Sequence, residues 1–217
     1  MSSFTHLLFD LDGTLTNPRL GIGNSLKYAL HQMHINGYSE QILEQFIGPP
    51  LQQGFKTIFG LNERNTELAV EHFRTYFGEK GLFENEPYQG ISELLEGLHL
   101  SGKRIYVVTS KLEKYAQMII RHFEFDRYID DLQGAEYSGT HSGKGQLIGQ
   151  LLERNSILPA SSVVMIGDTH YDLTGAKEQG ISSVAVGYGF GTLETLNACN
   201  PDYMVGSVEE LSELLVG

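Results

Sequence analysis

Two aspartates stand two residues apart near the start of the sequence, in the stretch LLFDLDGTLTN. An apolar run, residues 4–9, predicts a buried strand that ends at Asp10, and Gly13 then turns the chain into a loop. Side chains at positions i and i+2 of an extended segment leave on the same face, so Asp10 and Asp12 are expected to point into one space. Such close like charges repel each other, and a shared proton, a metal ion or water must offset the repulsion.

Further polar residues follow other apolar stretches. Thr109 and Ser110 close IYVVTS, Lys144 opens a predicted helix, and Asp168 and Asp172 follow VVMI. The carboxyl ends of parallel strands meet at one edge of a sheet, so these side chains are expected to converge on the edge that holds the first two aspartates. Carboxylates gathered in this way suit a hard divalent cation, and Mg²⁺ binds few carboxylates together with waters and a substrate phosphate.

This constellation predicts phosphoryl chemistry. Asp10 and Asp168 are expected to bind Mg²⁺, while Lys144, Thr109 and the backbone N–H groups after Asp10 would hold phosphate oxygens. A carboxylate beside a metal-bound phosphoryl group can attack phosphorus, which gives an aspartyl phosphate.

The second half of the sequence alternates between strand-like and helix-like stretches. Such alternation without hairpin signals predicts an α/β fold with a doubly wound parallel sheet, helices covering both faces. The glycine-rich stretch GYGFGT (187–192) predicts a flexible strand-to-helix loop at the same edge. The predicted strands are 103–110, 161–168 and 181–189, and the predicted helices are 111–123, 144–154, 171–179 and one opened by Ser207 with Glu210.

Residues 18 to about 82 break this alternation, because they have helical periodicity throughout. Leu68, Phe73 and Phe77, for example, are expected on one buried stripe, and the proline pair in IGPPL (47–51) would stop a helix. A helical block after the first strand of a parallel sheet lies above the carboxyl ends of the strands. It is therefore a candidate lid, with plain helical packing as the alternative.

Composition limits the partners. The 217 residues include 15 Lys and Arg against 27 Asp and Glu, and the formal net charge of −12 opposes binding to nucleic acid or to an anionic membrane. Cys199 is the one cysteine, so no internal disulfide can form. The sequence has no signal-peptide pattern and no apolar run long enough for a membrane span, and a cytoplasmic location is expected.

Taken in order, these motifs resemble the haloacid dehalogenase-like hydrolase superfamily, in its phosphatase branch. DLDGT resembles the first motif of that family, VVTS the second, Lys144 the third and GDTHYD the fourth. Gly145 departs from the pattern, since many relatives have proline after the lysine. The resemblance implies a Rossmann-like catalytic core of residues 1–16 and 83–217, with an inserted all-helical cap of residues 17–82.

The resemblance also implies roles for individual residues. Asp10 would be the nucleophile and Asp12 the general acid that protonates the leaving oxygen and then activates water. The implied Mg²⁺ site comprises Asp10, Asp12 through its backbone carbonyl, Asp168 and Asp172. The implied catalytic set is Asp10, Asp12, Thr109 and Lys144, and the implied substrate-binding set is Gly13, Thr14, Arg19, Ser110 and Lys111.

The predicted function is a Mg²⁺-dependent phosphatase that hydrolyses a small, phosphoglycolate-like phosphorylated metabolite through a phospho-aspartate. Four alternatives stay open: a 5′-nucleotidase or a pyrophosphatase of the same fold, a phosphomutase similar to β-phosphoglucomutase, and a non-catalytic sensor of a phosphoryl ligand. The protein is expected to be a monomer or a homodimer.

Overall fold

The computed structural model describes residues 4–47, 51–136, 143–158 and 160–216. The chain divides into two compact units, one formed by residues 1–17 and 87–217 and the other by residues 18–86. The proline pair of IGPPL lies outside the described residues. Among the residues that are described, no helix is both long enough and apolar enough to cross a bilayer.

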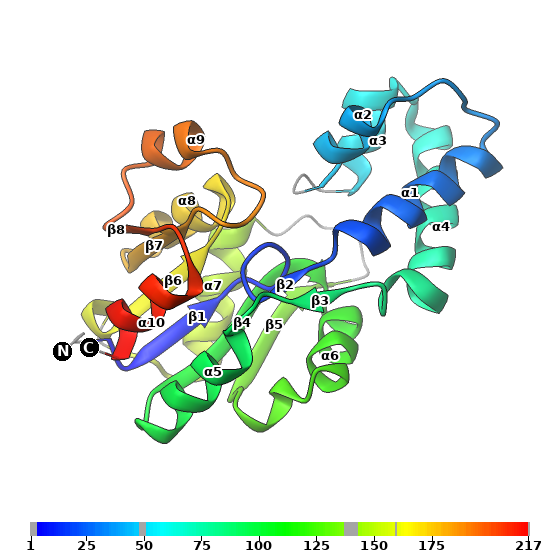
Figure 1. The fold of residues 1–217 in the computed structure, drawn as a ribbon. Coiled ribbons are helices and arrows are strands. Elements are labelled where there is room, and N and C mark those ends of the chain that lie inside the picture. The colour runs from blue at the N-terminus through cyan, green and yellow to red at the C-terminus, as the bar shows by residue number, and fades with distance from the viewer. Residues whose placement is uncertain (1–3, 48–50, 137–142, 159, 217) are drawn as a thin grey trace. The chain divides into compact units, whose positions relative to one another are not determined.

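The first unit is built on a parallel six-stranded sheet with the order β5-β4-β1-β6-β7-β8 (Figure 1). β6 is a continuous buried apolar run and β1 is one after His6, as expected for strands that are covered on both faces. The predicted α/β fold class is therefore confirmed. The strands are β1 (His6–Phe9), β4 (Arg104–Leu112), β5 (Asp131–Ala135), β6 (Val163–Gly167), β7 (Ser182–Val186) and β8 (Tyr203–Val205).

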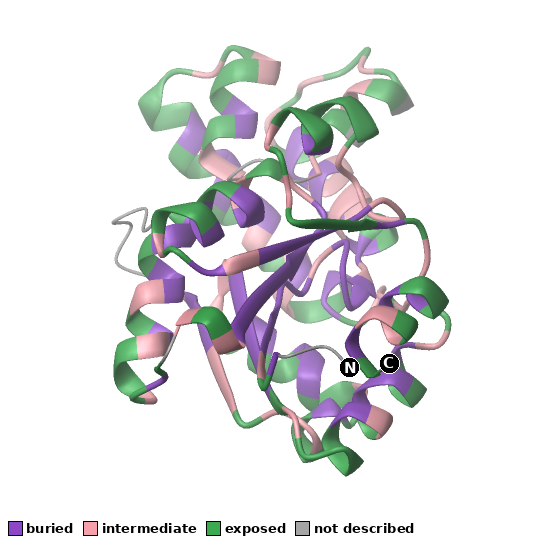
Figure 2. Ribbon diagram, turned by 90° about the vertical axis from the view of Figure 1, so that its left-hand side faces the viewer, coloured by how far each residue is buried: buried purple, intermediate pink, exposed green. Residues whose placement is uncertain are grey.

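Helices cover this sheet on both faces. α7 packs against α8, and α5 packs against α10, so each pair covers part of the sheet. Figure 2 shows the buried residues concentrated along the strands. Leu8, Val108 and Met165 belong to one buried cluster with Leu147 and Leu151 of α7. The helices are α5 (Ile91–Leu100), α6 (Glu113–His122), α7 (Lys144–Arg154), α8 (His170–Glu178), α9 (Leu193–Ala198) and α10 (Val208–Val216), with 3₁₀ turns η2 (Phe125–Arg127) and η3 (Ala160–Ser162).

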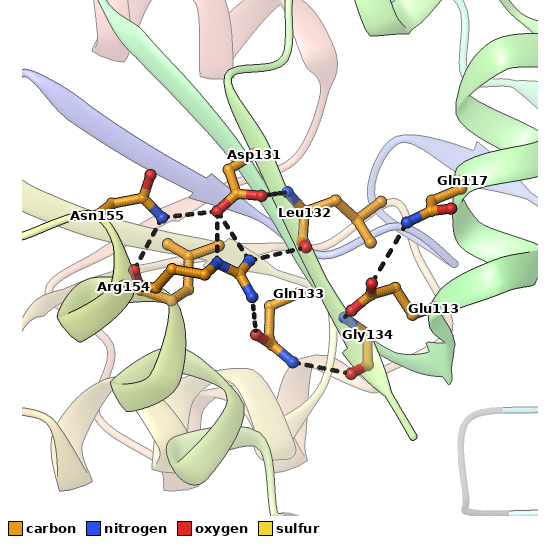
Figure 3. A network of polar contacts seen from close by, with 9 residues as sticks. Glu113, Gln117, Asp131, Leu132, Gln133, Gly134, Arg154 and Asn155 are labelled. Carbon is orange, nitrogen blue, oxygen red and sulfur yellow. Dashed lines mark hydrogen bonds and ion pairs between the residues drawn. The ribbon is translucent and has the colours of Figure 1, made fainter. Parts of the chain in front are cut away.

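The edge strand β5 is held by polar side chains (Figure 3). The N–H groups of Leu132 and Gly134 donate to Asp131 and Glu113, and the Leu132 carbonyl accepts from Arg154. These bonds satisfy backbone groups that an edge strand would otherwise leave unpaired. A cavity of about 610 Å³ beside this network is lined by residues that include Glu113, Gln133 and Arg154, and by none of the predicted site residues.

The second unit is helical. Gly21 of α1 lies against the backbone of Gly81, since a Cβ on Gly21 would stand 1.9 Å from the Gly81 carbonyl oxygen. Phe46, Phe55 and Phe73 form an aromatic cluster with ring centroids 4.8 to 6.1 Å apart. The helices of this unit are α1 (Arg19–Gln32), α2 (Glu40–Gln45), α3 (Leu51–Phe59), α4 (Glu63–Tyr76) and the π-helix η1 (Phe77–Gly81). Two short strands pair with each other where the chain passes between the units, β2 (Thr16–Asn17) and β3 (Glu86–Pro87).

The predicted stripe of α4 is wrong at one position. Phe73 and Phe77 are buried, but Leu68 is 43% exposed. The buried face of α4 consists of Thr66, Ala69, Val70 and Phe73, which follow each other at helical spacing and leave Leu68 on the opposite side.

Candidate active site

The loop after β1 sets the position of the first aspartates. The N–H of Asp10 donates to the Ile166 carbonyl at 2.9 Å, so Asp10 extends the pairing of β1 with β6. Gly13 has φ +90°, a left-handed conformation that favours glycine, and a Cβ there would stand 2.2 Å from Asp168 Oδ2. The turn at Gly13 therefore brings the loop directly against Asp168.

Lys144 links the two aspartate-bearing segments. Its Nζ lies 2.7 Å from Asp10 Oδ1 and 2.8 Å from Asp172 Oδ1, and it donates to the Val108 carbonyl at 2.9 Å. The Lys144 side chain is 3% exposed. Lys144 is the first residue of α7, and the packing of that helix on the sheet delivers the ammonium to the carboxyl end of β1.

Asp10, Asp168 and Asp172 form one cluster of buried carboxylates, in which ligand oxygens from each lie within 4.8 Å of one another. Asp168 accepts from the Phe190 N–H at 2.7 Å. Asp172 is held by the capping box of α8, where its Oδ2 accepts from the N–H and the hydroxyl of Thr169 at 3.0 and 2.8 Å.

Burial makes this cluster costly to ionise. It raises the pKa of Asp10 to about 7, against the opposing effect of Lys144. Burial, followed by the charges of Asp172 and Asp10, raises the pKa of Asp168 to about 8. Burial alone would lower the pKa of Lys144, but Asp10 and Asp172 outweigh it and raise that pKa, so the ammonium stays charged.

The cluster fits a hard divalent cation. Among the described residues, the Lys144 ammonium pairs with two of these three carboxylates, so the group carries surplus negative charge when it is ionised. All donors are carboxylate oxygens, which is the donor type that Mg²⁺ and Ca²⁺ prefer. A bound cation would stabilise the ionised forms of Asp10 and Asp168 and offset the effect of their burial.

Asp12 has a separate partner. Its Oδ2 lies 2.7 Å from Lys111 Nζ, and the side chains of Lys111 and Asp12 are 8% and 23% exposed. The register of β4 with β5 shifts between Val108 and Leu112, and an irregularity of this kind re-aims side chains at a strand end. Lys111, predicted to bind substrate, thus lies beside the predicted general acid, and Asp12 Oδ1 is buried without a hydrogen-bond partner among the described residues.

The remaining predicted site residues are placed as follows. Thr14 is fully buried and its hydroxyl donates to Asp168 Oδ1 at 3.4 Å. Thr109 is buried, and its hydroxyl accepts from the Lys111 N–H at 3.2 Å, whereas Ser110 is exposed. Arg19 is the first residue of α1 and belongs to the other unit, so its predicted role in binding substrate stays a prediction.

The sequence prediction missed the contacts made by residues 187–191. Phe190 contributes a backbone N–H to Asp168, and Tyr188 donates its hydroxyl to the Thr14 carbonyl at 3.1 Å. The glycines of GYGFGT correctly indicated a loop. Because glycine has no side chain, the same glycines were also the signal that the backbone of this loop could lie close to another segment.

Comparison with known proteins places the chain in a family. Residues 7–186 match the family described as haloacid dehalogenase-like hydrolase. The chain is 42% identical to a 5′-nucleotidase of Pseudomonas aeruginosa, over 98% of this chain and 96% of that protein. It is 31% identical to the tyrosine-protein kinase PtkA of Mycobacterium tuberculosis, over 96% of this chain and 72% of that protein.

A solved structure agrees with these matches. The crystal structure of a predicted phosphatase from Clostridium acetobutylicum is 37% identical, covers 97% of each chain and superposes with a TM-score of 0.91. The chain therefore belongs to the haloacid dehalogenase-like hydrolase family, which confirms the resemblance of its motifs and the prediction of a hydrolase.

Proposed function

We propose that the protein is a Mg²⁺-dependent phosphatase that hydrolyses a small phosphorylated metabolite through a phospho-aspartate on Asp10. One observation carries the proposal. Asp10 is held by the ammonium of Lys144 at 2.7 Å, within a cluster that also contains Asp168 and Asp172, while Asp12 lies outside that cluster on Lys111. This arrangement supports a nucleophile, a metal-binding group and a separate acid on one sheet edge.

In the first step, Asp10 attacks phosphorus and the bond from phosphorus to the ester oxygen breaks. Lys144 holds Asp10 Oδ1, which leaves Oδ2 to form the new bond. Asp12 gives its proton to the leaving oxygen, so that oxygen departs as a hydroxyl group and not as an alkoxide. Lys111, 2.7 Å from Asp12, keeps that carboxyl beside the leaving group.

In the second step, water attacks phosphorus and the bond between phosphorus and Asp10 breaks. Asp12 takes the proton from the attacking water, and the Asp10 carboxylate is regenerated together with inorganic phosphate. Asp10 and Asp168, with the Asp12 carbonyl and Asp172 beside them, would hold Mg²⁺, which supplies positive charge to the phosphoryl oxygens. Thr109 and the backbone after Asp10 would hold the same oxygens.

Two substrate classes stand first. The first is a phosphoglycolate-like metabolite, because segments of the chain resemble those of phosphoglycolate phosphatase-like proteins. The second is the nucleoside 5′-monophosphates, because one relative is named as a 5′-nucleotidase. We propose the helical unit, residues 18–86, as the lid over the site, and its loops together with Arg19 as the source of specificity.

The test is release of inorganic phosphate with Mg²⁺ from phosphoglycolate, nucleoside 5′-monophosphates, pyrophosphate and sugar phosphates. Asp10→Asn serves as the blank, and Asp126→Asn, which alters an exposed carboxylate, serves as the matched control. We expect one substrate class to stand out with wild-type and Asp126→Asn protein, and no release with Asp10→Asn or with a chelator. Isomerisation of a sugar phosphate without net release would favour a phosphomutase instead, and binding without turnover a sensor.

A further inference from the structure

The loop after β7 packs its backbone onto Asp168. A Cβ on Gly189 would stand 2.3 Å from Asp168 Cβ and 2.4 Å from the Gly13 carbonyl oxygen, and a Cβ on Gly191 would stand 2.0 Å from the Asp168 carbonyl oxygen. No side chain fits at either position without displacing Asp168 or the loop at Gly13. The two glycines therefore allow the backbone of this loop to lie directly against Asp168 and against the loop at Gly13.

Both oxygens of Asp168 have assigned donors. The Phe190 N–H donates to Oδ2 at 2.7 Å, and the Thr14 hydroxyl lies 3.4 Å from Oδ1. The first is a short hydrogen bond from backbone to carboxylate and fixes the rotation of the carboxyl group. The second connects Asp168 to the loop that follows Asp10.

Tyr188 connects the two loops a second time. Its hydroxyl donates to the Thr14 carbonyl at 3.1 Å, and its ring packs edge-on against Tyr88 at a centroid distance of 4.9 Å. Tyr88 in turn donates its backbone N–H to the Leu15 carbonyl at 3.1 Å. Burial, with smaller effects of Tyr88 and Asp168, raises the pKa of Tyr188, so the hydroxyl remains a donor.

These contacts form a closed circuit. Thr14 bonds to Asp168 through its side chain and to Tyr188 through its carbonyl, and Phe190, two residues after Tyr188, returns to Asp168. In such a closed ring of hydrogen bonds, each bond limits the movement of the groups that make the others. The ring therefore holds the Asp168 carboxyl group more firmly than separate bonds would.

We propose that Tyr188 is a positioning residue, whose hydroxyl holds the loop after Asp10 in register with Asp168 so that both carboxylates face one cation. The inference rests on the metal site of the proposed function. It assigns a role to a side chain whose hydroxyl bonds to the Thr14 carbonyl and that acts through Thr14.

The test is Tyr188→Phe, which removes the hydroxyl and keeps the ring against Tyr88. Metal-free protein is titrated with Mg²⁺ alone while the melting temperature is followed, which yields an apparent dissociation constant. We expect Mg²⁺ binding about fivefold weaker, as for the loss of one hydrogen bond, with a lower kcat and a KM within about twofold of wild type. Tyr203→Phe, which removes the same atom from a half-exposed ring, should match wild type in every readout.

Two results would overturn the role of Tyr188. One is wild-type Mg²⁺ affinity in Tyr188→Phe, including the case in which only the metal-free melting temperature falls, since that indicates a structural contact alone. The other is wild-type protein that binds no Mg²⁺. If wild type binds Mg²⁺ but releases phosphate from no substrate, the proposed function fails, and the Mg²⁺ titration of Tyr188→Phe still decides the inference.

Discussion

At the residue scale, the two aspartates after β1 do not share one partner. Asp10 pairs with Lys144 and Asp12 pairs with Lys111, each at 2.7 Å between charged atoms. The expected repulsion between the two carboxylates is thus offset by two separate ammonium groups, those of Lys144 and Lys111. This arrangement gives the two carboxyl groups different surroundings, as a nucleophile and an acid require.

Lys144 should be the residue on which the stability of the site depends most. Lys144→Met leaves Asp10 and Asp172 buried without their cation, so we expect the free energy of unfolding to fall by about 3 kcal/mol near neutral pH. Chemical denaturation measures this loss. Lys177→Met, at an exposed position of α8, should change stability little, and an equal loss in both variants would contradict the buried pairing.

The sequence was sufficient to predict which residues gather at the sheet edge, but not all of their contacts. Asp10 and Asp168 follow from strand ends in a parallel sheet, and Lys144 follows from the start of a predicted helix. The pairing of Lys111 with Asp12 depends on the register shift at the end of β4, and no residue type in that strand predicts the shift. The Phe190 N–H is a backbone group, so the identity of the side chain carries no information about it.

At the element scale, the crossing of α7 and α8 sets the distance between Lys144 and Asp172. A Cβ on Gly175 would stand 2.8 Å from the Gly145 backbone N and 3.1 Å from the Lys144 carbonyl carbon. The two helices therefore touch through backbone at the level of the site. A Cβ on Gly145 would stand 1.9 Å from Glu178 Oε2 of α8, so a larger residue there would displace the Glu178 side chain.

Gly175→Ala should separate these helices. We expect a loss of about 2 kcal/mol in the free energy of unfolding from overpacking, and a lower phosphatase rate because Asp172 moves away from Lys144. Gly97→Ala is the matched control, because a Cβ on Gly97 of α5 meets nothing within 4 Å. That control should stabilise the protein by about 0.5 kcal/mol. Equal stability of the two variants would show that α7 and α8 do not meet as described.

Elements with strong patterns were predicted and weak ones were missed. The helix predicted over 144–154 is present with those bounds, and the strands predicted over 161–168 and 181–189 are present with their ends shifted by a few residues. β5 was missed because DLQGA is polar and contains glycine, and side chains from α6 and α7 bond to its backbone. The cap of α10 is present in part, since Glu210 N–H donates to Ser207 but the Glu210 carboxylate accepts from Gly206.

At the scale of the whole molecule, the acidic cluster makes stability depend on pH. Asp10 and Asp168 have folded-state pKa values of about 7 and about 8, above the ordinary value of 3.8. Between the ordinary and the raised values, the folded state binds more protons at these groups than the unfolded state. Stability of the metal-free protein must therefore fall as pH rises through that window.

Metal-free protein should melt at a lower temperature at about pH 8 than at about pH 5, with a contribution of up to about 1.4 kcal/mol per pH unit from each group. Added Mg²⁺ should raise the melting temperature most at the higher pH, because it binds the ionised carboxylates. Asp10→Asn removes one titrating group and should flatten the profile. A profile that is unchanged by Mg²⁺ would contradict the assignment of the cluster as a metal site.

The central claim is that the phosphoryl group passes through Asp10, and the most direct measurement is its detection there. Wild-type protein is mixed with its best substrate and Mg²⁺, quenched in acid within one turnover, digested and analysed by mass spectrometry. The proposed mechanism predicts one added phosphoryl group on the peptide that contains Asp10, and none in Asp10→Asn. Phosphate release without that adduct, or an adduct on a different residue, would contradict it.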